Sequence, residues 1–229
     1  MKKPLTQEEH TAGRWSIQHA HQANQPASRR ERRKLATREA LIKAAQEVLA
    51  VKGVYLAVIE EITERADVAK GSFYQYFRNR DELLDVLLTR RLEELQTRLE
   101  ATPPTDTFAA SVRTFIHHHL EYFLQHEDFL LFLHQLRGLI TLNRDDTPAV
   151  RETYRRYLVF LATWLHADGV PTADAGPTPE EGVCTLLGLL TGFLSHYALL
   201  APLATLAPQS KRIETSLTTA CLAFWQGSA

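Results

Sequence analysis

Two phenylalanines, Phe73 and Phe77, lie four residues apart in a stretch whose other side chains are polar or flat. At that spacing both can face a core from one side of a helix. The opposite side is left to Lys70, Ser72, Tyr74, Gln75 and Tyr76. Hydrogen-bonding and flat side chains of this kind suit contact with phosphates and base edges. Gly71, near the start of the same helix, would let a backbone approach closely and direct N–H groups at an anion.

A helix-turn-helix would position these side chains. Short helical patterns cover 58–65 and 69–77, and a longer helix precedes them. In that longer helix Ser28 and Glu31 have the spacing of a capping box, and Gly53 stands where a C-terminal stop belongs. Two short helices packed on a preceding helix form the motif that places its second helix in the DNA major groove.

The remainder of the sequence also predicts helices. Asn79 and Glu82 have cap spacing, so a helix is expected from there to about residue 100, before Pro103 and Pro104. Apolar residues then recur at helical spacing in 106–126, 128–142, 147–167, 180–201 and 209–226. Because no convincing strand pattern occurs, the predicted fold is all-α, with an N-terminal three-helix helix-turn-helix domain and a C-terminal helical domain.

The charge distribution matches this division. Residues 1–80 hold 15 Lys and Arg against nine Asp and Glu, whereas residues 81–229 hold 11 against 18. A basic head on an acidic body indicates that only the head meets a polyanion, although chance asymmetry would give the same counts. We expect a flexible arm over 1–27, a DNA-binding domain over 28–80, and a ligand-binding and dimerisation domain over 81–229.

A basic cluster opens the first predicted helix. Arg29, Arg30 and Arg33 lie in its first turns, where positive charge opposes the helix macrodipole. Phosphates would offset that cost, so the cluster is a second candidate DNA contact. The alternative is a solvated helix start without a partner.

Cysteine use and hydropathy bear on the compartment. Cys184 and Cys221 lie in apolar helical patterns, so buried thiols in a reducing cytoplasm are expected. Lys2 and Lys3 are not followed by an apolar run, so no secretory signal is predicted. Residues 182–209 contain no Asp, Glu, Lys or Arg and are long enough to cross a bilayer. The polar residues and proline within that segment favour a buried or dimer-interface helix.

Residues between 37 and 88 form a specific combination. Its members are Ala40-Leu41-Ile42-Lys43-Ala44-Ala45, Gly53, Ile62, Ala66-Asp67-Val68, Gly71-Ser72-Phe73-Tyr74-Gln75-Tyr76-Phe77 and Arg80-Asp81-Glu82-Leu83-Leu84. This combination resembles the TetR (tetracycline-repressor-like) family of transcriptional regulators. The resemblance covers about fifty residues, and the C-terminal part shares with that family only its helical character.

The resemblance implies roles for individual residues. Phosphate contacts would come from Tyr74, Tyr76 and Arg80, and base-edge contacts from Lys70, Ser72 and Gln75. Gly71 would lie at the groove surface. With the basic cluster, the expected DNA-binding set is Lys70, Gly71, Ser72, Tyr74, Gln75, Tyr76, Arg80, Arg29, Arg30 and Arg33. The expected core residues are Phe73, Phe77, Ile62 and Val68.

The sequence departs from the family pattern in three places. Ala57 and Val58 stand where a capping threonine usually begins the first short helix, which puts its phosphate contact in doubt. Asp67 replaces the usual turn glycine; Asp tolerates a left-handed conformation better than most residues. Ala69 replaces the usual Ser or Thr cap of the recognition helix, at a cost of about 1 kcal/mol.

The resemblance also implies a homodimer held by the last two long helices. Gly188 and Gly192 would permit close helix approach, and dimerisation would make the operator near-palindromic. A small, largely hydrophobic or aromatic effector would bind among the other helices and favour a spacing of the two heads that no longer fits the operator. The expected ligand-binding set is His119, Tyr122, Phe123, His134, Arg137, Tyr154, Tyr157, Trp164, Phe193 and Tyr197.

Within that set two residues have plainer explanations. Arg137 could meet an acidic ligand, but it could equally reach water or pair internally. His119 is more often a hydrogen-bonded core histidine than a ligand group. Because His117, His118 and His119 point about 100° apart on a helix, they cannot all bind one metal. We therefore expect no metal site and no cofactor.

Three other classes of protein compete with a ligand-responsive repressor. The sequence has no P-loop, no Gly-x-Ser-x-Gly and no dinucleotide glycine pattern, so an enzyme is not expected. A DNA-binding adaptor without a small-molecule effector would have a filled C-terminal core. A membrane-anchored regulator would use residues 182–207. Effector identity, operator sequence, target genes and the role of the arm 1–27 are not encoded in any pattern found.

Overall fold

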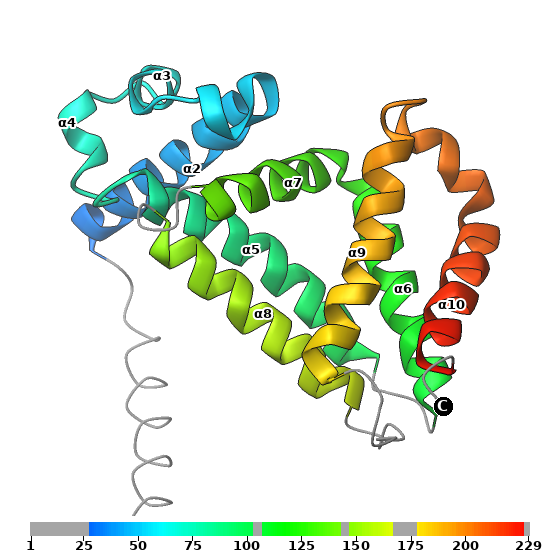
Figure 1. Cartoon of the computed structure of the whole chain (residues 1–229). Coiled ribbons are helices and arrows are strands. Elements are labelled where there is room, and N and C mark those ends of the chain that lie inside the picture. Colours follow the sequence, from blue (N-terminus) through cyan, green and yellow to red (C-terminus); the bar gives the residue numbers. More distant parts are fainter. Residues whose placement is uncertain (1–27, 103–106, 143–146, 167–177, 227–229) are drawn as a thin grey trace, which may run out of the picture. The chain divides into compact units, whose positions relative to one another are not determined.

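The computed structural model describes residues 28–102, 107–142, 147–166 and 178–226 (Figure 1). All the regular elements within those ranges are helical, as predicted. The chain divides into two compact units, residues 1–40 and 41–229. The arm expected over 1–27 lies outside the described residues.

Helix α2 (Arg29–Leu56) begins at the predicted capping box. The backbone N–H of Ser28 donates to a Glu31 carboxylate oxygen at 2.6 Å, and the Glu31 N–H donates to Ser28 Oγ at 3.2 Å. These hydrogen bonds lower the pKa of Glu31. The basic side chains of this first turn are exposed.

Helix α2 is interrupted at Gly53, the glycine at which the sequence predicts its end. Gly53 has a φ of 74° and a ψ of 173°, a conformation that side chains rarely allow. The N–H of Val54, directly after the break, donates to Gln135 Oε1 at 2.6 Å. Gln135 lies in α7 (Glu127–Leu142), so this break is bridged by a residue 81 positions away.

The first predicted short helix is α3 (Ile59–Arg65). The second, predicted over 69–77, is shorter: α4 (Lys70–Phe73) is followed by a turn, so Phe77 lies outside it. Both helices pack with α2 and the start of α5 (Arg80–Ala101) around one small core. The buried members of that core are Leu41, Ile42, Ala44, Ala45, Val48, Ala57, Ile62, Phe73, Phe77, Leu83 and Leu87. Asn79 caps α5 as predicted, because its side chain accepts from the Glu82 N–H at 2.9 Å.

The C-terminal helices follow the predicted order. They are α6 (Phe108–Gln125), α7, α8 (Pro148–His166), α9 (Pro179–Tyr197) and α10 (Ser210–Gln226). Helix α9 ends at Tyr197 rather than at 201, and a 3-10 helix, η2 (Leu203–Gln209), follows it. Pro202 accounts for part of this difference, since a proline disfavours helical backbone in the residue before it.

A larger core joins these helices. Helix α5 packs along α8, α8 along α9, and α6 along α10 (Figure 1). Asp81, near the start of α5, is buried and accepts from the backbone N–H groups of Ala149 at 3.0 Å and Val150 at 3.4 Å. It therefore satisfies the first turn of α8, and burial raises the pKa of its carboxyl group. The start of α5 is thus tied to the start of α8.

Two expectations from hydropathy have different outcomes. Among the helices described, none combines the length and apolarity needed to cross a membrane. Cys221 is buried as predicted, but Cys184 is exposed, so that prediction was wrong. Cys184 lies on α9 at positions i, i+4 and i+8 with Gly188 and Gly192, on a stripe whose glycines have open space beside them.

His119 is fully buried in α6. Its Nδ1 lies 2.8 Å from the Phe115 carbonyl oxygen and its Nε2 lies 2.9 Å from the Tyr157 hydroxyl. The ring stacks on Phe115 with centroids 4.1 Å apart. Burial lowers the pKa of His119 from 6.5 to about 4.

The stability of the fold should therefore depend on this histidine in acid. The unfolded chain takes up the proton near pH 6.5 but the folded chain only near pH 4. The contribution is complete above pH 6.5 and declines as the pH falls toward 4, by up to about 1.4 kcal/mol per pH unit. Urea unfolding at pH 7 and pH 5 should show that wild type loses about 2 kcal/mol more than His119→Gln.

The exposed His134 provides a matched control for this measurement. The variant His134→Gln should keep the full wild-type loss between pH 7 and pH 5. Equal losses for wild type and His119→Gln would show that the His119 imidazole accepts its proton in the folded state as readily as in the unfolded one.

Candidate nucleic-acid interface

The recognition segment consists of α4 and the turn Tyr74-Gln75-Tyr76. Phe73 and Phe77 are 0% and 1% exposed, as the spacing predicts, and their rings lie 5.4 Å apart. Tyr74 is 53% exposed. The predicted outer set divides by exposure: Lys70, Gly71, Tyr74 and Gln75 are exposed, while Ser72 and Tyr76 are half-buried. Two buried rings thus hold a polar surface outward.

The turn before α4 has the conformation that the sequence predicts. Asp67 has a φ of 54°, in the left-handed region. Neither Val58, at the start of α3, nor Ala69, at the start of α4, makes a side-chain cap hydrogen bond. The motif therefore forms without its usual caps, and Ile62 (3% exposed) and the half-buried Val68 pack into the shared core.

Lys70 has a partner that the sequence did not indicate. Its ammonium group pairs with the Glu60 carboxylate of α3, and this hydrogen bond raises the pKa of Lys70 and lowers that of Glu60. Both side chains are more than half exposed, so the pair is worth little in water. Glu60 thus lies beside Lys70 at the edge of the recognition segment without holding it firmly.

Arg80 lies at the start of α5, directly after the segment. Its guanidinium is half-buried, and burial lowers its pKa. Its Nη2 atom is buried without a hydrogen-bond partner among the described residues. An anion would satisfy such a donor. Nearby Arg78 is 87% exposed at its side chain and bonds Glu82; its basic type is the only sign of it in the sequence, since it belongs to no predicted motif.

The basic cluster at the start of α2 belongs to the other unit. Arg29, Arg30 and Arg33 are exposed, and the Thr37 hydroxyl donates to the Arg33 carbonyl at 3.1 Å. They meet the simplest requirement for a phosphate contact, which is access. Their role as DNA contacts stays a prediction.

The ligand-binding candidates of the C-terminal helices fall into three groups. His119, Tyr122, Phe123, Tyr157 and Trp164 are buried, Arg137, Tyr154 and Tyr197 are half-buried, and His134 and Phe193 are exposed. The structure brings several of them together. His119 bonds Tyr157, and Arg137 bonds Tyr154 and donates to Thr191 Oγ1 at 3.3 Å. Arg137 thus has internal partners, and its role toward a ligand stays a prediction.

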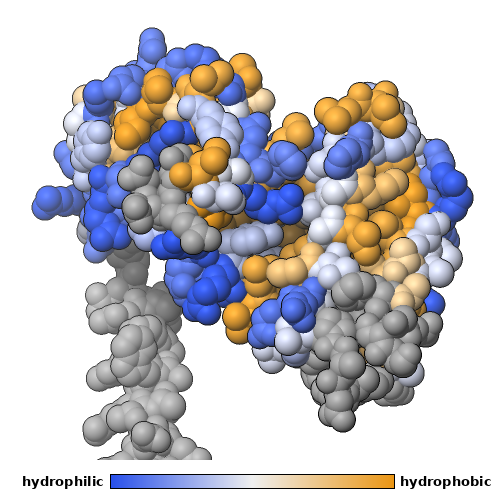
Figure 2. Space-filling view, in the orientation of Figure 1, coloured by the Kyte–Doolittle hydropathy of each residue, from blue (hydrophilic) through white to orange (hydrophobic). Residues whose placement is uncertain are grey.

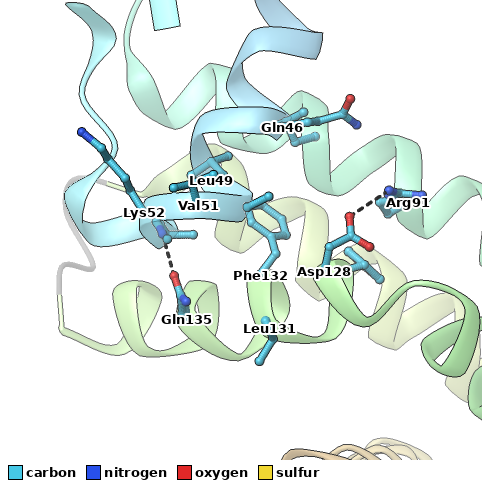
Figure 3. A pocket seen from close by; sticks show the side chains of 14 residues that line it. Gln46, Leu49, Val51, Lys52, Arg91, Asp128, Leu131, Phe132 and Gln135 are labelled. Atoms are coloured by element: carbon cyan, nitrogen blue, oxygen red, sulfur yellow. Dashed lines mark hydrogen bonds and ion pairs between the residues drawn. The ribbon is translucent and has the colours of Figure 1, made fainter. Parts of the chain in front are cut away.

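A pocket of about 460 Å³ lies elsewhere, where α2, α5 and α7 meet (Figure 3). None of the ten ligand-binding candidates lines it. Its polar residues, none of which was predicted to bind a ligand, are Gln46, Lys52, Arg91, Asp128 and Gln135. They come from three helices and from no local motif, so sequence spacing carries no signal for them.

Two of the three consecutive histidines converge with an acidic residue. Ligand atoms of His117, His118 and Glu121 lie within 4.8 Å of one another on α6. His119 points into the core instead, as expected from its position on the helix. Because a spacing of 4.8 Å can be bridged by an ion, the expected absence of a metal stays a prediction.

Comparison with known proteins points in one direction. Residues 41–87 match the family model of "Bacterial regulatory proteins, tetR family". An uncharacterised helix-turn-helix transcriptional regulator of Bacillus subtilis, YxbF, is 34% identical over 80 residues, which is 34% of this chain and 21% of that protein. The TetC protein of transposon Tn10 from Escherichia coli is 20% identical over 163 residues, or 71% of this chain and 79% of TetC.

Solved structures share the fold. A transcriptional regulator from Rhodococcus sp. Rha1 aligns with a TM-score of 0.64 at 22% identity, over 83% of this chain and 97% of that one. The regulator FadR of Bacillus subtilis, solved in complex with stearoyl-CoA, aligns with a TM-score of 0.61 at 18% identity, over 81% and 98%. With the family match at 41–87 and the helix-turn-helix core built on Phe73 and Phe77, this part of the chain is an N-terminal domain of the TetR type of bacterial regulatory proteins.

Proposed function

We propose that this protein is a transcriptional repressor that binds a near-palindromic operator as a homodimer and is released by a small effector. The observation that carries the proposal is the recognition segment, whose polar face is exposed while Phe73 and Phe77 are buried. Such a face can enter a major groove without unfolding its own support. The proposal includes a DNA-binding domain over 28–80 and a ligand-binding and dimerisation domain over 81–229.

The side chains of the segment take different parts. Gln75 and Lys70 are exposed and long enough to reach base edges, with Ser72 beside them. Tyr74 and Tyr76 offer hydroxyl groups to phosphates on either side. Lys70 would exchange or share its contact with Glu60 when it meets DNA. Arg80 would contact a further phosphate beside the segment through the exposed part of its half-buried guanidinium.

Selection of duplexes from a random pool tests the DNA-binding proposal. Wild type should enrich one near-palindromic sequence. Tyr74→Ala should lose that enrichment because the variant removes a half-exposed ring and hydroxyl, while the buried Phe73 and Phe77 still hold the segment. Val159→Ala, a change at a similarly exposed position of α8, should enrich the same sequence as wild type. Enrichment by Tyr74→Ala equal to that of wild type would remove this tyrosine from the interface.

The salt dependence of binding tests Arg80 separately. Each phosphate contact that is lost reduces the slope of log affinity against log salt by about one. On the selected duplex, Arg80→Ala should therefore bind more weakly and with a slope about one smaller than wild type. Arg155→Ala, which removes an exposed arginine from α8, should leave the slope unchanged. An unchanged slope for Arg80→Ala would mean that its guanidinium meets no phosphate.

Helices α9 and α10 support the homodimer. Figure 2 shows hydrophobic surface over the part of the molecule that they form. Leu189 and Phe193 of α9 are 39% and 37% exposed, although side chains of this kind favour burial. A Cβ added at Gly188 or Gly192 would meet nothing within 4 Å, so the glycine stripe faces away from its own protomer. A second copy packed on this stripe would bury the apolar residues beside it.

A substitution at Gly188 tests the dimer. Gly188→Arg should leave the protomer folded, because the site is open and arginine favours a helix over glycine. It should convert the dimer to a monomer by placing a long charged side chain between two close helices. Sedimentation should give twice 26.0 kDa for wild type and 26.0 kDa for the variant. Thr97→Arg on α5 is the matched control, and a dimeric Gly188→Arg would place the interface elsewhere.

The effector proposal rests on the buried aromatic set of the C-terminal helices. His119, Tyr157 and Phe123 lie together there, and their rings favour a hydrophobic or aromatic molecule. FadR of Bacillus subtilis, which shares the fold, was solved with stearoyl-CoA, an amphipathic molecule. An effector would act by favouring a spacing of the two recognition segments that does not fit the operator. Because such a regulator acts on chromosomal DNA, we place it in the cytoplasm.

A further inference from the structure

The pocket between α2, α5 and α7 has a closed floor and an open rim. Val54, Leu87 and Phe129 form the floor and are at most 4% exposed. Val51 and Leu131 stand at the rim and are 78% and 47% exposed. A volume of about 460 Å³ falls within the range of about 300–1,000 Å³ that is typical of small-molecule sites.

The charged residues of the lining already have partners. Lys52 pairs with Glu61, and Arg91 lies 3.2 Å from Asp128, which also lines the pocket, and 3.6 Å from Glu94 (Figure 3). The lining therefore offers an ionic ligand no unmatched charge. Binding an ion would require one of these pairs to break.

The polar groups that remain available are two side-chain amides. Among the described residues the Gln46 side chain makes no hydrogen bond, and Gln135 uses its Oε1 atom, which leaves its NH2 group to donate. Between them lie the apolar side chains of Leu49 and Phe132 (Figure 3). The chemistry of the pocket is that of an apolar slot with amide groups at its wall.

We propose that this pocket binds a neutral small molecule with an apolar or aromatic body and a hydrogen-bonding group that meets Gln135 or Gln46. This site is separate from the residues proposed above for the effector, since none of them lines it. Binding of a ligand in this pocket does not depend on the proposed function, whereas the effect of that binding on DNA affinity does.

That consequence follows from Gln135. The same side chain lines the pocket and accepts the Val54 N–H at the break in α2. The Tyr55 hydroxyl donates to the Gln135 carbonyl at 3.2 Å, so two contacts fix this end of α2 to α7. The fit is tight, because a Cβ added at Gly53 would lie 2.6 Å from Gln135 Oε1. A ligand that bonds the Gln135 amide therefore bears directly on the break.

The break in turn supports the recognition segment. Val48, before it, and Ala57, after it, belong to the same small core as Phe73 and Phe77. A change in the course of α2 at Gly53 would move the surface on which α3 and α4 pack. A small molecule in the pocket would thus act through α2 on the residues proposed to contact DNA. This effect would not require any change in the dimer.

The binding step is tested with N-phenyl-1-naphthylamine, a neutral aromatic fluorophore that brightens in apolar sites. Wild type should bind it saturably. Ala50→Trp, which places an indole in the lining at an exposed position, should lose one equivalent per chain or weaken binding at least about tenfold. Lys43→Trp, at an exposed position of α2 outside the lining, should bind as wild type does. Failure of wild type to bind, or equal binding by Ala50→Trp, would overturn the proposal.

The consequence is tested by amide hydrogen exchange. With the fluorophore bound, exchange in residues 53–57 should change in wild type and stay constant in Ala50→Trp. Gln135→Leu should speed exchange there without any ligand, because Val54 loses its acceptor. Saturable binding with unchanged exchange would overturn the link to α2.

A readout on DNA completes the test. On a duplex selected as above, the bound fluorophore should weaken the affinity of wild type and leave that of Ala50→Trp unchanged. Equal affinities with and without the fluorophore would show that the pocket does not act on DNA binding. If no duplex is selected at all, the proposed function fails, while the pocket is still judged by fluorescence and exchange.

Discussion

Burial of Phe73 and Phe77 is the constraint on which the recognition segment depends. Helix α4 has four residues, and a helix of that length does not form on its own in water. Its start also lacks a side-chain cap at Ala69. The two rings compensate by fixing the segment to a core supplied by α2, α3 and α5. The orientation of Tyr74 and Gln75 is therefore a property of the packing beneath them.

The break at Gly53 also depends on a residue that is distant in sequence. A backbone break inside a domain exposes an N–H group that must find an acceptor, and here the acceptor comes from α7. The small helix-turn-helix core and the larger core of the C-terminal helices are linked in two ways. One is the hydrogen bond from Val54 to Gln135, and the other is Phe132, which packs against both cores. Gln135 therefore has two roles, as the acceptor at the break and as part of the lining of the neighbouring pocket.

Local sequence patterns predicted the features that depend on residues close together in the chain. The capping pairs at Ser28 and Asn79 and the inward phenylalanines follow from spacings of three or four residues, and the left-handed turn at Asp67 follows from the resemblance to the family. The pairing of Lys70 with Glu60, the Gln135 bridge and the pocket could not be found in this way. These features join side chains that are distant in sequence. The periodicity of a helix predicts which of its faces is buried, but not which other helix that face will contact. Cys184 was misplaced for that reason, since an apolar stripe fits an interior and an interface equally well.

Asp81 and Arg80 are adjacent, but their side chains differ in how fully they are hydrogen-bonded. The carboxylate is anchored in the first turn of α8, while the guanidinium next to it keeps an unsatisfied donor. Because one peptide unit joins the two residues, the contact that caps α8 also fixes the backbone position of Arg80. The placement of Arg80 thus depends on a helix that begins far along the chain, at Pro148.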